Sequence, residues 1–130
     1  MDKALEKQLI DEFPTYFRDI YGDPKKTCMS VGCAFRNGWF AILHNLCSQV
    51  QVVEDQHTDF YFLQLKEKFG IFTAYCSYKS QHEAIGKLIR AAAQVSSQVC
   101  EKCASEEDVT TEGQHWVRTW CKKCAEGYER

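Results

Sequence analysis

The feature that most constrains this chain is a set of four cysteines arranged as two close pairs. Two residues separate the members of each pair and seventeen separate the pairs, which are Cys100 with Cys103 and Cys121 with Cys124. Each pair can turn tightly enough to direct two thiolates at one ion, and the segment between them is long enough to bring the pairs together. The spacing therefore predicts one structural Zn²⁺ with four cysteine ligands, in a zinc ribbon over residues 100–130.

Other uses of paired cysteines fit this sequence less well. A thioredoxin-type site needs its pair at the start of a helix within a βαβ unit, and only six residues follow Cys124. Attachment of a c-type haem requires a histidine after the second cysteine, where Ala104 and Ala125 stand. A catalytic zinc ion keeps an open position, whereas four thiolates complete its shell. The pattern therefore favours a structural metal.

Basic side chains are expected near these cysteines, because four thiolates around one Zn²⁺ leave two excess negative charges. The candidates by position are Lys102, His115, Arg118, Lys122 and Lys123. We interpret them first as compensation for the thiolates and second as a patch for phosphates. The whole chain has 16 Lys+Arg against 18 Asp+Glu, a formal net charge of -2, so a general nucleic-acid coat protein is disfavoured and any nucleic-acid contact must be local.

Apolar residues at helical spacing predict three helices in the first three quarters of the chain. They cover residues 2–13, 39–53 and 81–99, and the last is expected to run directly into Cys100. Turn signals between the first two predict an ordered loop over residues 17–38 that aromatic residues anchor.

Two strand-like runs, at 59–68 and 71–76, predict a β-hairpin. An isolated hairpin is marginal in water, so this one must pack on the helices. At 130 residues the chain can bury one real core. The expected fold class is α+β: a domain over residues 1–99 with helices packed on a β-hairpin, and a C-terminal four-cysteine zinc ribbon over 100–130 packed against it.

Simple alternation along the first strand divides its side chains between two faces. Phe60, Phe62 and Gln64 fall on one face, whereas Tyr61, Leu63 and Leu65 fall on the other. The phenylalanines are expected in the core, since aromatic side chains supply much of the burial in small domains.

The hairpin is also a candidate binding surface. Phe72 and Tyr75 could act as stacking platforms flanked by Lys66, Lys68 and Lys79, as in single-strand binders. The plainer interpretation places the phenylalanine in the core but leaves Lys66 and Lys68 on one exposed face. The sequence leaves open whether the hairpin face is core or binding surface.

The other four cysteines do not have the spacing of a tight metal knuckle. Cys33, Cys47 and Cys76 are best explained as small buried residues. A second metal site formed by Cys28, Cys33, His44 and Cys47 stays open but is the weaker hypothesis.

A catalytic set is not evident in the sequence. His44 and Cys47 would be neighbours on one helix, but no third group is placed to orient the histidine. Paired carboxylates suited to acid–base work and a Gly-rich phosphate loop are also lacking. We therefore expect a protein that is not an enzyme.

The N-terminal residues and the hydropathy predict a location. Residues 1–7 carry no apolar core of the kind a signal peptide needs, and the most apolar stretch, 39–53, is too short and too polar to span a membrane. We expect a cytoplasmic protein without a membrane partner.

The motifs taken together resemble small zinc-ribbon proteins encoded by tailed bacteriophages and prophages. The resemblance covers most of the chain and rests on Phe13-Pro14 with Phe17, Cys28-Met29, Gly38-Trp39-Phe40, Leu46-Cys47, Lys66-Glu67-Lys68-Phe69-Gly70 with Phe72 and Tyr75, Ser96 or Ser97, Cys100-Glu101-x-Cys103, and Trp120-Cys121-x-x-Cys124. This chain departs from the pattern where an arginine is usual before the last hairpin aromatic, because Thr73 and Ala74 follow Phe72. It also has Ala104 where glycine is usual after the first cysteine pair.

The resemblance implies a phage or prophage accessory protein in the cytoplasm of a bacterial host, without implying an activity. The expected function is to bind a host macromolecule, such as a host protein or an anti-phage defence protein, and to inhibit or redirect it. One alternative is a nucleic-acid-binding ribbon that uses Arg118, Lys122 and Lys123 with Lys66 and Lys68. A second is sequestration of a nucleotide signal by the 1–99 domain. The partner's identity and the oligomeric state stay open.

Overall fold

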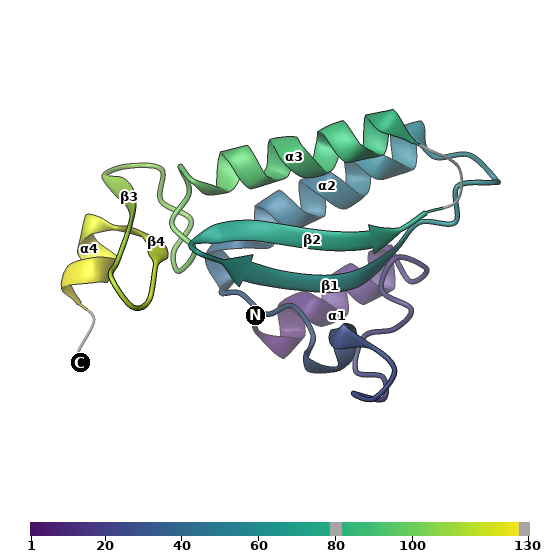
Figure 1. Cartoon of the computed structure of the whole chain (residues 1–130), viewed down its shortest axis with the longest axis horizontal. Coiled ribbons are helices and arrows are strands. Elements are labelled where there is room, and N and C mark those ends of the chain that lie inside the picture. Colours follow the sequence, from purple (N-terminus) through teal and green to yellow (C-terminus); the bar gives the residue numbers. More distant parts are fainter. Residues whose placement is uncertain (79–81, 128–130) are drawn as a thin grey trace.

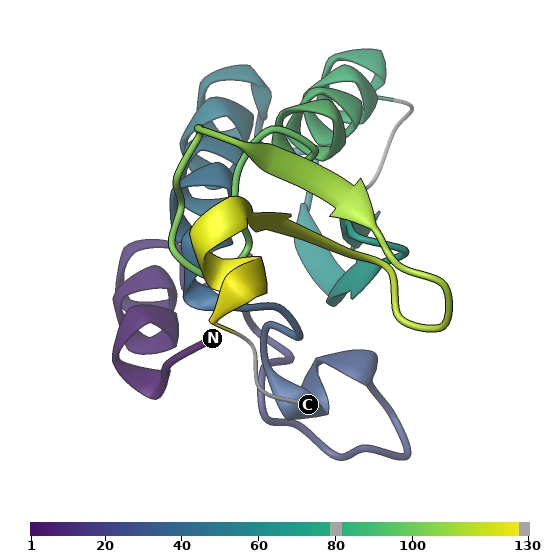
Figure 2. The same cartoon turned by 90° about the vertical axis from the view of Figure 1, so that its left-hand side faces the viewer.

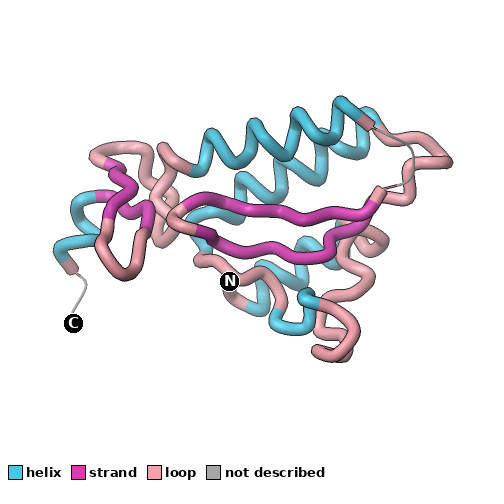
Figure 3. The backbone as a smooth tube through the Cα atoms, in the orientation of Figure 1, coloured by secondary structure: helices cyan, strands magenta, loops and turns pink. Residues whose placement is uncertain are grey.

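The structure is a computed structural model that describes residues 1–78 and 82–127. It combines helices with two small antiparallel hairpins, which confirms the α+β prediction (Figures 1 and 3). In chain order the elements are α1 (Lys3–Glu12), the short 3₁₀ turns η1 (Cys28–Val31) and η2 (Asn37–Trp39), α2 (Phe40–Val53), β1 (Tyr61–Lys68), β2 (Ile71–Ser77), α3 (Glu83–Ser96), β3 (Val109–Glu112), β4 (Arg118–Cys121) and α4 (Lys122–Glu126).

The helices form one side of the molecule and the first hairpin packs against them. Helix α2 lies between α1 and α3, and the β1–β2 hairpin runs along the same direction (Figures 1 and 2). The β3–β4 hairpin and α4 form a small unit at one end, beyond the turn of the first hairpin. This C-terminal unit, residues 100–127, is called the ribbon below.

The main core is aromatic and lies between the first hairpin and the helices. The ring of Phe72 packs 5.2 Å from that of Phe35 and 6.1 Å from that of Trp39. Phe72 is 1% exposed and faces inward opposite Glu67 in the register. The candidate role of Phe72 as a stacking platform is therefore wrong, because the inner face of the hairpin buries its ring.

A β-bulge changes the faces of β1 from those that simple alternation predicts. The register with β2 shifts between Phe62 and Gln64, so that one extra residue is inserted. As a result Leu65 is buried on the same face as Phe62, whereas Leu63 is 41% exposed. The prediction that Leu63 and Leu65 share a face is wrong, because a single inserted residue reverses every side chain after it.

The third helix is shorter than its apolar pattern predicts. It ends at Ser96, and the backbone N–H groups of Ser97 and Val99 make 3₁₀-type hydrogen bonds instead. The Ser96 hydroxyl accepts a hydrogen bond from the backbone N–H of Phe72 at 3.0 Å, which joins the helix end to β2. The expectation of a helix running directly into Cys100 is thus wrong, and its predicted first residue, Gln81, lies outside the described residues.

A buried carboxylate holds the 17–38 loop against α1. Glu6 is 2% exposed and accepts hydrogen bonds from the Tyr21 hydroxyl at 2.5 Å and from the Cys33 backbone N–H at 2.6 Å. Phe17 and Phe35 are buried at the two ends of this segment. The loop is therefore ordered and anchored by aromatic residues, as the sequence predicts.

Three core thiols make the stability sensitive to alkaline pH. Burial raises the pKa of Cys33 and of Cys76 to about 12, and raises that of Cys47 well above its ordinary value. Above about pH 8.5 these thiols ionise in the unfolded chain but stay protonated in the folded one, so folding stability is lost as the pH rises from that value toward 12. We expect Cys33 and Cys76 each to cost about 1.5–2 kcal/mol at pH 10, and Cys47 to act in the same direction.

Urea unfolding of the metal-loaded chain and of its Cys76→Ala variant at pH 7.5 and pH 10 measures the contribution of one core thiol. The metal-bound cysteines, whose contribution has the opposite sign, affect both chains equally and cancel in this comparison. Between the two pH values the original chain should lose about 1.5–2 kcal/mol relative to the variant, and equal pH dependence of the two chains would contradict the burial of this thiol.

Candidate metal centre and adjoining surfaces

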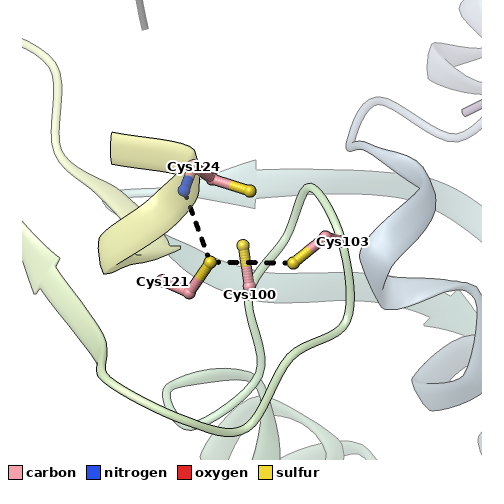
Figure 4. Close-up of side chains that lie close together, drawn as sticks. All are labelled: Cys100, Cys103, Cys121 and Cys124. Atoms are coloured by element: carbon pink, nitrogen blue, oxygen red, sulfur yellow. Dashed lines mark hydrogen bonds between the residues drawn. The ribbon is translucent and has the colours of Figure 1, made fainter. Parts of the chain in front are cut away.

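The four cysteines of the two pairs converge at one point. Their sulfur atoms all lie within 4.8 Å of one another (Figure 4). Cys100 follows the end of α3, Cys121 ends β4 and Cys124 lies on α4. In the described ranges 1–78 and 82–127, this is the one group of three or more His, Cys, Asp or Glu side chains with such a spacing. The cluster could hold a metal ion, as the sequence predicts.

The geometry of the cluster fits a tetrahedral ion with sulfur ligands. The Sγ atoms of Cys103 and Cys121 lie 3.7 Å apart. Zinc–sulfur bonds of about 2.3 Å give a tetrahedron whose sulfur–sulfur edge is roughly 3.8 Å. Cys100 and Cys121 are buried and Cys103 is exposed, so the cluster lies just below the surface.

Electrostatics also favours a cation among these sulfurs. The backbone N–H of Cys124 donates to Cys121 Sγ at 3.5 Å, which lowers the pKa of the Cys121 thiol to about 7. Burial, followed by the neighbouring sulfurs, raises the pKa of Cys124 to about 12. One thiolate thus forms readily and disfavours ionisation of the others, so four thiolates together require a cation among them to offset part of their charge.

The turn after the first pair is strained by an alanine. Ala104 has a φ angle of 69°, and its backbone N–H donates to the carbonyl of Cys100 at 2.9 Å. A left-handed residue is normally glycine, because a Cβ atom is crowded there. Glycine at this position would relieve the strain.

Glu101, which sequence reasoning missed, joins the ribbon to the main core. Its side chain is 4% exposed and accepts from the Arg36 backbone N–H at 3.1 Å, and its carbonyl accepts from the Gly38 N–H at 2.7 Å. On the other side of the ribbon, the Thr119 hydroxyl donates to the carbonyl of Gly70 at 2.5 Å. Residues at both the η2 turn and the hairpin turn therefore fix the ribbon in place.

Three cations surround the indole ring of Trp120, directly before Cys121. The charged groups of Arg118, Lys102 and Arg36 lie 4.8, 5.4 and 5.5 Å from the ring centroid. Trp116 packs edge-on against the same ring at 5.5 Å. Positive charge therefore gathers around the ring of the residue that precedes Cys121 in the chain.

The ribbon lysines do not form a uniform basic patch. Arg118 and Lys122 line a hollow of about 530 Å³ that Asp108, Glu112 and Glu126 also line. Lys123 is exposed nearby on α4. Three carboxylates interleaved with two cations are poorly suited to a phosphate backbone.

The outer face of the β1–β2 hairpin collects the remaining candidate residues. Lys66 and Lys68 lie on one face, opposite Thr73 and Ile71 in the register, and the Lys66 ammonium lies 5.7 Å from the ring centroid of Tyr75. Tyr75 is 43% exposed, and Lys79 lies outside the described residues. We call this surface the hairpin face and define it by its outward residues, which are Leu63, Gln64, Lys66, Lys68, Phe69, Ile71, Thr73 and Tyr75.

The His44 and Cys47 pair is not arranged for nucleophilic catalysis. His44 Nε2 lies 2.7 Å from a carboxylate oxygen of Glu12, and this contact lowers the pKa of Glu12. Cys47, however, is 0% exposed, and burial raises the pKa of its thiol. A buried, protonated thiol is a poor nucleophile even when its neighbour is oriented.

Among the described residues, no helix is both long enough and apolar enough to cross a membrane. Comparison of the chain with protein-family models, with curated proteins and with solved structures finds no match.

Proposed function

We propose that this chain is a non-enzymatic accessory protein of phage type, held together by one structural Zn²⁺ at Cys100, Cys103, Cys121 and Cys124. It acts in the bacterial cytoplasm by binding a host protein and inhibiting or redirecting it. The observation that carries the proposal is the hairpin face, where exposed apolar and aromatic side chains accompany two lysines. The resemblance to phage-encoded zinc-ribbon proteins supplies the biological setting.

The composition of the hairpin face favours a protein partner. Phe69 is 72% exposed, and Leu63, Ile71 and Tyr75 are each 40–43% exposed, so the face offers a mixed aliphatic and aromatic surface. Exposed apolar groups gathered in this way commonly mark interfaces, and aromatic anchors carry much of the binding energy.

The charge of the hairpin face defines the chemistry of its partner. The carboxylate of Glu67 lies away from it and accepts a hydrogen bond from the Gly70 backbone N–H at 3.0 Å. Lys66 and Lys68 are therefore the charged members of the face, and we expect them to meet an acidic surface that surrounds an apolar patch.

A photo-crosslinking amino acid in place of Tyr75 tests this proposal in bacteria. We expect it to capture one host protein, and we expect Lys66→Glu with Lys68→Glu to reduce the captured amount at least tenfold, because the lysines steer and pair with the partner. The same crosslinker in place of Gln8, on the exposed side of α1, is the matched control and should not capture that protein. Equal capture from both sites, or capture that the two charge reversals leave unchanged, contradicts the proposal.

Binding of single-stranded nucleic acid is the second candidate function. The contact between Lys66 and the Tyr75 ring favours it, since stacked aromatic and basic groups are typical of single-strand binders. This function predicts that nuclease treatment abolishes crosslinking through position 75. It also predicts that the affinity for oligonucleotides falls steeply as the salt concentration rises. The mixed charges around Arg118 and Lys122 argue against an extended path for the strand.

A further inference from the structure

A groove between α2 and α3 lies outside both the hairpin face and the cluster of four cysteines. It has a volume of about 360 Å³ and runs from the first cysteine turn along both helices. Ile42, Leu46 and Ala92 form its buried floor, and Val95, at its rim, is 50% exposed. The groove therefore presents apolar surface to solvent between the first part of α2 and the last part of α3.

Charged side chains are depleted around the groove. Although 26% of the chain is charged, the 14 residues of α2 contain no Asp, Glu, Lys or Arg. In α3 the charged residues are confined to its first part, and residues 91–99 have none. Depletion of charge with retention of apolar and amide groups is characteristic of the centre of a protein interface.

Among the residues that the structure describes, the one charged side chain that lines the groove is Glu106, at the end near the cysteine cluster. Glu107 and Asp108 follow it and are exposed, so this end of the groove is acidic. Asn45 and Gln49 line the opposite part with neutral amides. A nucleotide is disfavoured as the occupant, because no lysine or arginine within the described ranges 1–78 and 82–127 lines this groove to meet its phosphates.

We propose that the groove binds an amphipathic helix of a partner protein, with apolar side chains on the floor and a basic residue against Glu106. The backbone groups of α2 and α3 are used within the helices, so an extended peptide would bury unpaired polar groups, whereas a helix satisfies its own. The part of α2 from Ala41 to Gln49 that lines the groove spans roughly 12 Å, which matches two to three turns of a partner helix. The inference goes beyond the proposed function, because it concerns a second surface on different elements.

Two labelled synthetic peptides of 15 residues test this proposal on the metal-loaded full chain. Both carry leucine at i, i+3, i+4 and i+7, and they differ in whether the last turn has two lysines or two glutamates. We expect the lysine peptide to bind about threefold more tightly, which is the size of a surface charge pair. Glu106→Lys should reverse that preference, and this reversal controls for the different helix contents of the peptides.

Val95→Glu should weaken binding of the lysine peptide at least tenfold, because it places a carboxylate over the apolar floor. Val52→Glu is the matched control: Val52 is 84% exposed on α2 and does not line the groove, so binding should change less than twofold. The double substitution Lys66→Glu with Lys68→Glu should also leave peptide binding unchanged, which separates this result from the test of the hairpin face.

Failure of both peptides to bind overturns the proposal, as does binding that Val95→Glu leaves unchanged. Sedimentation of the chain alone tests whether a second copy of this chain occupies the groove. A concentration-dependent dimer that Val95→Glu abolishes would assign the groove to a second copy of this chain instead.

Discussion

Replacing Cys121 with serine, or removing the metal ion by chelation, is expected to unfold the ribbon and leave the main core folded. The reason is the size of the ribbon's own core: its buried cluster consists of Cys100, Trp120 and Cys121, and two of these three residues belong to the sulfur cluster. So little burial cannot offset the loss of chain entropy. The proposed zinc ion would supply the difference, since structural zinc contributes on the order of 10–16 kcal/mol in small zinc peptides.

Tryptophan fluorescence and amide resonances measure this unfolding separately in the two parts. Trp120 is 2% exposed and lies in the ribbon, whereas Trp39 is 0% exposed and lies in the main core. Chelation should expose Trp120 and collapse the amide dispersion of residues 100–127, but the resonances of the main core should persist. The purified protein should contain one zinc ion for each chain.

Cys28→Ser is the matched control for the metal centre. Cys28 is exposed and lies outside the sulfur cluster, so this substitution should leave both metal content and ribbon folding unchanged. A ribbon that stays folded without metal, or a Cys121→Ser variant as stable as the original chain, would show that the cluster is not a structural metal site.

Replacing Gly38 with alanine is expected to destabilise the whole chain by about 3 kcal/mol or more and to weaken metal binding. A Cβ atom at Gly38 would overlap the carbonyl oxygen of Cys100 and lie 2.5 Å from the carbonyl of Glu101. Both neighbours are backbone groups, which cannot rotate away as a side chain can. The ribbon would have to move off the η2 turn, and the hydrogen bond from the Gly38 N–H to the Glu101 carbonyl would be lost.

Gly86→Ala is the matched control, because Gly86 lies within α3 and its added Cβ would meet only a flexible side chain. The atom nearest to its added Cβ is the end of the flexible Arg90 side chain, at 3.3 Å. Alanine there should raise the unfolding free energy by up to about 1 kcal/mol through helix propensity. Urea unfolding and competition with a chromophoric chelator measure both variants, and equal effects of the two substitutions would refute the close approach at Gly38.

Some features of this protein follow from short stretches of sequence alone. The two cysteine pairs predict the sulfur cluster because each pair needs only a local turn to direct its thiolates. The helical spacing of apolar residues predicts α1 and α2 within one residue at each end. These signals are local, so no knowledge of distant contacts is needed to interpret them.

Other features depend on contacts that alternation and spacing do not encode. The bulge after Phe62 moves Leu65 into the core, and α3 ends at Ser96 where that hydroxyl meets β2. The groove between α2 and α3 exists only because two apolar helices lie side by side and leave part of each uncovered. Sequence spacing describes each helix separately and so does not predict the groove.

The sequence by itself determined the four clustered cysteines, the α+β class and the position of Lys66 and Lys68 on a common face, because each depends on local spacing along the chain. The tertiary structure decided which neighbours those elements have. It buried Phe72 and placed carboxylates beside Arg118 and Lys122, so that these two cations form no continuous basic surface. It also joined the ribbon to the core through Gly38 and Glu101. These outcomes depend on packing between residues far apart in the chain, where small differences in register or volume decide which surfaces are buried and which stay free to bind.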